Sequence, residues 1–154
     1  IASLEHRLQL SPEVLLCHGT PDSDLHYFLE TVEPSLLRPA TMPEIDARLG
    51  QVDARVRLVA CGHTHVPRVV RASGGQLIVN PGSVGLQAYD DVHPHPHVVE
   101  TGSPDARYAI VERLATGWAS TLITVPYDHA SMAALAMSNG RPDWASALAT
   151  GRMP

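Results

Sequence analysis

The chain has 154 residues, enough for one ordinary domain with a single buried core. Its 16 acidic and 11 basic side chains give a formal net charge of −5. This charge does not suit a general nucleic-acid binder, which must neutralise phosphates. No stretch approaches the roughly 18 consecutive apolar residues that a membrane span needs, and no secretory signal is visible. Cys17 and Cys61 each close an apolar run and form no disulfide framework, so we expect buried thiols in a soluble cytoplasmic protein.

The first half of the chain predicts strands around one helix. Glu13–Gly19, EVLLCHG, is a short apolar run that ends in glycine, which favours a strand entering a loop. After a stretch of turn formers, MPEIDARLGQV has Pro43 near the start and Gly50 near the end of an expected helix. Val56–Ala60, VRLVA, follows as a buried strand.

The second half predicts hairpins and then helices. Two β-branched runs flank Ser73–Gly75, which is typical of a hairpin. Residues 87–106 show no periodic core, and a loop of that length is usually functional or mobile. Residues 107–126 predict a second hairpin. The tail, 128–151, predicts two helices, the first capped by Asp128. The order of elements indicates a mixed α/β fold in a single domain over residues 1–154.

Three histidines directly follow the apolar strands: His18 in CHG, and His63 and His65 in CGHTHVP. In an extended segment, residues two apart point to the same side, so the second and third histidines can face one site. Neutral imidazole is the commonest metal-binding side chain and suits several divalent metals. Gly19 and Gly62 lie beside the motifs and let the backbone turn sharply. Taken alone, a His-x-His pair is equally compatible with a structural role.

The motifs VLLCHG, LVACGHTHVP and LIVNPGSVG occur in this order between about Val14 and Gly85. Together they resemble the C-terminal half of the calcineurin-like metallophosphoesterases, in particular the small bacterial and archaeal phosphodiesterase-like branch. The resemblance implies a four-layer αββα sandwich, of which this chain carries only the C-terminal half. Its expected parts are the core motifs 14–85, a loop 87–106, a hairpin 107–126 and a helical tail 128–151.

The resemblance also implies a reaction, which is hydrolysis of a phosphomonoester or phosphodiester by a hydroxide that bridges two divalent metals. Manganese, iron, zinc and nickel all suit such ligands. Two cations about 3.5–4 Å apart would clamp the attacking and leaving oxygens. By the same resemblance, His18 and His63 would ligate one metal and His65 the other. The resemblance further implies a structural turn, without ligands, at Asn80, Pro81 and Gly82.

The family's other motifs, Asp-x-His, Gly-Asp-x-x-Asp and Gly-Asn-His-(Asp/Glu), lie upstream of the position of His18. The last two are absent here, and Asp-x-His occurs only at 24–26 and 91–93, where loop roles are favoured. Since the chain begins with Ile1 rather than Met, we expect the catalytic residues in upstream sequence and none within this chain. The 154 residues alone should then be inactive. The alternative is a non-catalytic metal-binding or structural module derived from the same fold.

Thr20, His95 and His97 are candidates for contact with the phosphate-ester substrate. Thr20 follows the His18 motif, and turn capping is its simpler role. In the His-Pro-His-Pro-His run, alternating prolines favour a polyproline helix whose histidines do not share one face, so a solvated loop is favoured over a substrate-facing lip. No nucleic-acid or membrane partner is expected. Strand edges that lack upstream partners would be open to pairing with a second copy.

Overall fold

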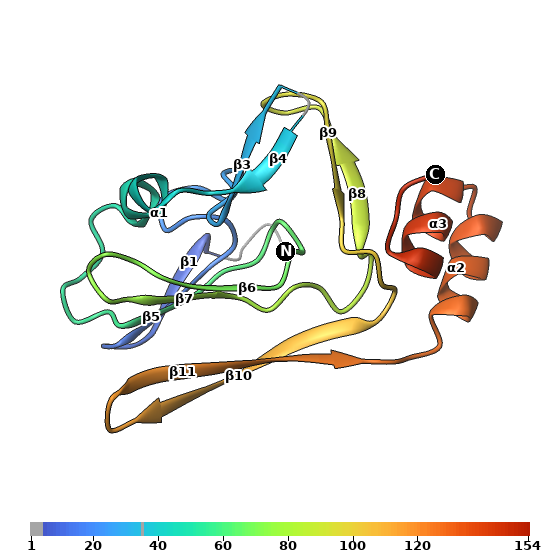
Figure 1. The fold of residues 1–154 in the computed structure, drawn as a ribbon. Coiled ribbons are helices and arrows are strands. Elements are labelled where there is room, and N and C mark those ends of the chain that lie inside the picture. Colours follow the sequence, from blue (N-terminus) through green and yellow to red (C-terminus); the bar gives the residue numbers. More distant parts are fainter. Residues whose placement is uncertain (1–4, 35) are drawn as a thin grey trace.

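A five-stranded mixed sheet lies at the centre of the fold, with the strand order β1-β2-β5-β7-β6 (Figure 1). The computed structural model describes residues 5–34 and 36–154. Strands β2, β5 and β7 are parallel, whereas β1 and β6 pair antiparallel at the two edges. The bounds are β1 (Arg7–Ser11), β2 (Val14–Cys17), β5 (Leu58–Ala60), β6 (Arg68–Arg71) and β7 (Leu77–Asn80).

One helix, three hairpins and a pair of helices surround this sheet (Figure 1). The hairpins are β3 (Glu30–Glu33) with β4 (Leu36–Pro39), β8 (Ala88–Asp91) with β9 (His97–Glu100), and β10 (Ala106–Leu114) with β11 (Gly117–Val125). The helices are α1 (Met42–Leu49), α2 (His129–Ser138) and α3 (Pro142–Thr150). Helices α2 and α3 pack against each other, and α3 also contacts β8. None of the described helices is long and apolar enough to cross a membrane.

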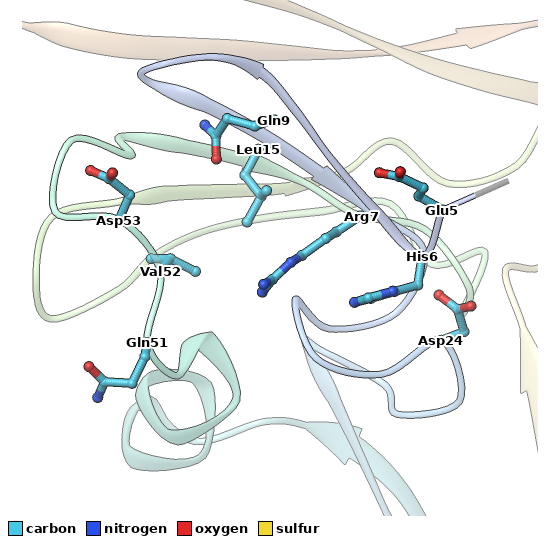
Figure 2. A pocket seen from close by; sticks show the side chains of 9 residues that line it. All are labelled: Glu5, His6, Arg7, Gln9, Leu15, Asp24, Gln51, Val52 and Asp53. Atoms are coloured by element: carbon cyan, nitrogen blue, oxygen red, sulfur yellow. The ribbon is translucent and has the colours of Figure 1, made fainter.

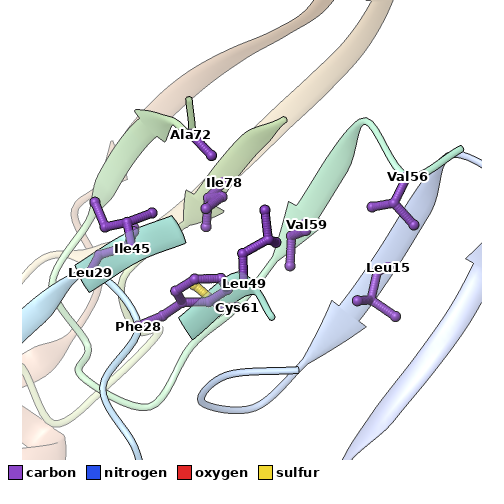
Figure 3. Packing of buried hydrophobic residues seen from close by; sticks show 10 residues of the cluster. All are labelled: Leu15, Phe28, Leu29, Ile45, Leu49, Val56, Val59, Cys61, Ala72 and Ile78. Atoms are coloured by element: carbon purple, nitrogen blue, oxygen red, sulfur yellow. The ribbon is translucent and has the colours of Figure 1, made fainter. Parts of the chain in front are cut away.

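The face of the sheet toward α1 carries the larger apolar cluster. Leu15, Val59 and Ile78 are register partners on β2, β5 and β7, so their side chains share this face. They belong to one buried cluster with Ile45 and Leu49 of α1 (Figure 3). Burying each such aliphatic side chain contributes about 1.5–3 kcal/mol. This contact therefore anchors the helix to the three strands whose ends carry the histidines.

The opposite face is covered by the long β10–β11 hairpin. Val14, Leu58 and Leu77 occupy the register positions that alternate with those of the first face. Ala109 of β10 and Trp118 of β11 pack against this second cluster. The fold therefore has a helix, a sheet and a second β-layer stacked in that order. This arrangement confirms the predicted mixed α/β class.

The helix boundaries agree with the local signals in the sequence. The Glu44 carboxylate accepts a hydrogen bond from the Thr41 amide over 2.6 Å at the start of α1. The Asp128 side chain accepts from the Ser131 amide over 3.1 Å and caps α2 as predicted. Gly151 ends α3 with a φ of 69°, a left-handed conformation that glycine adopts without steric cost. Both predicted hairpins are also present, as β6–β7 and β10–β11.

Residues 87–106 are not a continuous loop as the sequence suggested. They contain the β8–β9 hairpin, in which Tyr89 is opposite Val99. Along β9, buried and exposed residues alternate, so His97 and Val99 point inward. This hairpin could not be predicted from the sequence, because its turn is a proline-rich run without the Asn-Gly or Asp-Gly pair typical of tight hairpins.

Candidate metal centre

His18 and His63 meet at one edge of the central sheet. His18 directly follows β2 and His63 lies just beyond β5, and these neighbouring parallel strands end at the same edge. The Gly62 amide donates to the His18 carbonyl oxygen over 2.8 Å and ties the two loops together. The two imidazole centroids are 4.9 Å apart, with their planes inclined at 49°. The structure therefore places two of the predicted metal-binding side chains next to each other.

The His63 ring is held in its neutral form. Burial lowers its pKa, and the neighbouring His18 ring lowers the pKa further. A neutral imidazole keeps the lone pair that a metal requires. Its Nε2 is 3.4 Å from the Leu25 carbonyl oxygen, a long and weak contact. At neutral pH this ring is thus ready to act as a ligand.

His65 is oriented by different neighbours. Its Nδ1 is 2.8 Å from the carbonyl oxygen of Leu86, so this nitrogen carries the proton and donates it. Its ring also packs edge-on to Tyr89, with centroids 5.4 Å apart. A backbone carbonyl at one ring nitrogen is a common device for orienting a histidine whose other nitrogen binds a metal. The free Nε2 is the atom that can serve as a ligand.

The backbone at both histidines is left-handed, with φ of 66° at His63 and 59° at His65. The prediction that an extended segment directs both rings to one side is therefore wrong. Non-glycine residues in this conformation cost of order 1 kcal/mol each and cluster at functional sites. The turn of this loop, rather than strand alternation, sends the two rings to different neighbours.

Asn80, at the end of β7, holds the histidine loop from behind. It is 1% exposed, and its amide nitrogen donates to the Gly62 carbonyl oxygen over 2.7 Å and to the Thr64 hydroxyl over 3.0 Å. Its side-chain oxygen accepts from the Gly82 amide over 2.9 Å. Gly82 itself has a φ of 87°, which explains the glycine of the Asn-Pro-Gly turn. This turn supports the histidine loop, and both polar side-chain atoms of Asn80 make hydrogen bonds within it.

The three candidate substrate-binding residues have separate environments. Thr20 is buried, and its amide donates to the Ser23 carbonyl oxygen over 2.8 Å in a local turn. His95 is exposed on the β8–β9 turn. His97 is 8% exposed and faces the interior, where its Nε2 is 2.9 Å from the Tyr27 hydroxyl. Of the three, only His95 presents its side chain to solvent.

Parts of both Asp-x-His segments lie near His63 without forming a ligand group. Asp24 lines a cavity on the β1 side, whereas His26, Asp91 and His93 line the same cavity as His63. The Asp91 carboxylate accepts from the backbone amides of Val92 and His93 over 2.6 and 3.1 Å, as a turn cap does. Across residues 5–34 and 36–154, no three His, Cys, Asp or Glu side chains gather as a metal would need.

Two cavities flank the strand ends. One, of about 740 Å³, lies between β1 and the segment after α1 and is lined by charged side chains such as Arg7 and Asp53 (Figure 2). None of the three histidines lines it. The other, of about 680 Å³, is lined by His63 together with Tyr27, Arg48 and further side chains. Its contact with His63 makes the second cavity the approach to the candidate site.

No sequence pattern links Tyr27 with the histidines, yet its ring centroid lies 5.0 Å from that of His63. Its hydroxyl is 2.8 Å from that of Tyr89, which packs on His65. Burial is the main reason that the pKa of each tyrosine is raised, so both keep their protons and remain hydrogen-bond donors. No local pattern could have shown this contact, because the two tyrosines are 62 residues apart.

The sequence model of one protein family, the calcineurin-like phosphoesterase superfamily domain, matches residues 4–103 of this chain. The matched residues include all three histidines and the Asn-Pro-Gly turn. The chain belongs to this superfamily. No curated protein matches the chain.

Two solved structures share the fold. A metallophosphoesterase from Sphaerobacter thermophilus is 24% identical, with a TM-score of 0.67 over 98% of this chain and 61% of the other. A hypothetical protein from Pyrococcus horikoshii OT3 is 17% identical, with a TM-score of 0.63 over 99% of this chain and 53% of the other. The chain therefore spans between half and two thirds of the length of these two relatives.

Members of this superfamily generally bind divalent metals. The donor set here fits such an ion: His18 and His63 are adjacent imidazoles, and His65 has one nitrogen fixed and the other free. All three donors are imidazoles, and within the described residues no carboxylate completes a group of three around them. The three histidines are thus suitable ligands for a divalent metal, but they supply only part of its coordination shell.

Proposed function

We propose that this chain carries the histidine half of a metal-dependent phosphoesterase site. The observation that supports the proposal is the meeting of His18 and His63 at the ends of β2 and β5, with His65 held separately by Leu86. His18 and His63 would hold one divalent ion and His65 a second, of the manganese, iron, zinc or nickel type. The substrate would be a phosphomonoester or a phosphodiester.

A bound divalent metal supplies positive charge for the phosphate oxygens and lowers the pKa of a water nucleophile. The chain's own residues bind and orient. Asn80 fixes the loop that carries both His63 and His65. The cavity beside His63 gives an organic phosphate ester room to approach, since ligand pockets commonly measure about 300–1,000 Å³.

A second candidate function is a non-catalytic module that retains the histidines and binds at most one metal. It is favoured by the lack of any group of three ligands among the described residues. Three neutral ligands shared between two metals would leave both ions largely open. On either reading, we expect the 154-residue chain by itself to hydrolyse nothing.

Metal titration and an activity assay test the proposal. The purified chain should bind Zn²⁺ or Mn²⁺, His63→Ala should weaken binding, and Tyr108→Phe, an exposed change on β10, should not. None of these three proteins should hydrolyse a chromogenic phosphodiester. Hydrolysis by the 154-residue chain that disappears in His63→Ala would show that the site is complete without further sequence. Absence of metal binding would remove the basis of the proposal.

Stoichiometry separates the two candidates. In a protein extended by whatever is encoded upstream of Ile1, two metals per chain and hydrolysis support the enzyme. Zero or one metal, with normal folding and no hydrolysis, supports the module. The substrate is then found by comparing monoesters with diesters, because the residues that select it lie in loops.

A further inference from the structure

A buried hydrogen-bonded group joins the β8–β9 hairpin to the loop after β2. The Tyr27 hydroxyl is 2.8 Å from the Tyr89 hydroxyl and 2.9 Å from Nε2 of His97. Nδ1 of His97 is in turn 2.7 Å from the carbonyl oxygen of His95. Tyr27 and His97 are 9% and 8% exposed, so water contributes little to their hydrogen bonding. We call Tyr27, Tyr89 and His97 the tyrosine–histidine cluster.

One arrangement of protons satisfies the whole cluster. A carbonyl oxygen can only accept, so Nδ1 of His97 carries a proton and donates to His95. In the neutral ring, Nε2 is then an acceptor, and the Tyr27 hydroxyl donates a hydrogen bond to it. The Tyr27 oxygen is left to accept from the Tyr89 hydroxyl. Every donor has an acceptor in a fixed direction, which gives the cluster a single geometry.

The rings of the cluster pack directly on the two histidines of the candidate metal centre. Tyr27 meets His63 with centroids 5.0 Å apart and planes at 72°. Tyr89 meets His65 with centroids 5.4 Å apart and planes at 68°. Both contacts are edge-to-face, the arrangement that aromatic rings prefer. Each histidine of the His-x-His motif therefore has its own tyrosine, and the two tyrosines share one hydrogen bond.

Both histidines need such support, because their left-handed backbone is locally unfavourable. Conformations of this kind persist only when the surrounding structure fixes them more strongly than the strain opposes them. Asn80 fixes the backbone of the loop, but its side-chain hydrogen bonds go to Gly62, Thr64 and Gly82 and not to either imidazole. The Leu86 carbonyl oxygen and the Tyr89 ring hold the His65 imidazole, and the rings of His18 and Tyr27 lie against that of His63.

We propose that Tyr27, Tyr89 and His97 are positioning residues that set the relative orientation of His63 and His65 for metal binding. The inference rests on the proposed function, since it assumes that these histidines bind divalent metal. Groups that orient metal ligands typically change affinity by about 10- to 100-fold when they are replaced. The cluster acts through ring packing, so we expect the low end of that range.

Co²⁺ is a suitable probe, because its visible absorption reports both affinity and ligand geometry. Tyr27→Phe keeps the ring and removes only the hydroxyl, and His97→Leu removes the acceptor. Each should weaken Co²⁺ binding about tenfold and alter the absorption spectrum. His97→Gln offers an amide oxygen near the position of Nε2 and should stay within about twofold of the unsubstituted chain. Tyr108→Phe, on the exposed β10 strand, is the matched control and should change nothing.

All titrations are made at a temperature at which every metal-free variant is folded, as checked by thermal unfolding. A merely structural role would lower the unfolding temperature and leave the Co²⁺ affinity of the folded chain unchanged. If the unsubstituted chain binds no Co²⁺, the proposed function and this inference fail together. If it binds Co²⁺ and Tyr27→Phe and His97→Leu bind equally tightly, only the positioning role fails.

Discussion

Replacing Asn80 by alanine should destabilise the chain by about 3 kcal/mol, because the side chain makes three hydrogen bonds worth about 1 kcal/mol each. Their lengths are 2.7 Å to the Gly62 oxygen, 3.0 Å to the Thr64 hydroxyl and 2.9 Å from the Gly82 amide. Since Asn80 is 1% exposed, water cannot readily replace the lost partners. The figure is a large share of the roughly 5–15 kcal/mol that stabilises an ordinary domain.

Urea unfolding followed by tryptophan fluorescence measures this loss, and thermal unfolding should show a fall of about 6–12 °C. Asn139→Ala is the control, because Asn139 is exposed at the end of α2 and its replacement should cost less than about 0.5 kcal/mol. Asn80→Asp keeps the size of the side chain but turns an anionic oxygen toward the Gly62 carbonyl oxygen. It should be at least as unstable as Asn80→Ala.

The Asn80→Ala variant also tests whether this turn affects metal binding. Asn80 fixes the loop on which His63 and His65 lie, so the folded fraction of Asn80→Ala should bind Co²⁺ more weakly than the unsubstituted chain. Equal urea midpoints for Asn80→Ala and Asn139→Ala would refute the energetic argument. A large loss of stability with unchanged Co²⁺ affinity would refute the link between this turn and the histidines.

Three further predictions concern the backbone, the charges and the core. His63→Gly should be about 1 kcal/mol more stable than His63→Ala, because both lack the ring and only glycine adopts a φ near 66° without steric cost. Equal urea midpoints would contradict that backbone conformation. Arg38 holds the pKa of Glu44 well below its ordinary value of 4.5, so the unfolded state binds the proton first. The resulting stabilisation is present above about pH 4.5 and is lost as the pH falls through the folded-state pKa, so the urea midpoint should fall less steeply in Glu44→Gln between about pH 5 and pH 2. Ile78→Ala should cost about 3 kcal/mol in the fully buried cluster. Ile110→Ala, at a position 46% exposed, should cost less than about 1 kcal/mol, and equal losses would contradict the layer arrangement.

The helices and tight hairpins could be predicted because their signals are local. The proline and glycine around α1 lie within one helix length, as does the cap that Asp128 provides for α2. The β6–β7 hairpin turns at Ser73–Gly75, and the β10–β11 hairpin turns at Ala115 and Thr116, directly before Gly117. In each case the residues that decide the conformation are neighbours in the chain. The histidines at the strand ends were visible for the same reason.

The β8–β9 hairpin and the tyrosine–histidine cluster could not be predicted in this way. The inward direction of His97 depends on the pairing of β9 with β8 and on the buried hydroxyl of Tyr27, 70 residues away in sequence. The left-handed backbone at His63 depends on what surrounds the loop, since most residues avoid that conformation in isolation. Contacts between distant segments carry no periodic signal.

Short motifs and helix caps act through adjacent residues, so the family, the three helices and the candidate ligands His18, His63 and His65 could be predicted from the sequence. Which imidazoles meet and which separate depends on contacts between distant segments. Strands β2 and β5 end at one edge of the sheet, Asn80 fixes the loop, and a different tyrosine packs on each histidine of the His-x-His pair.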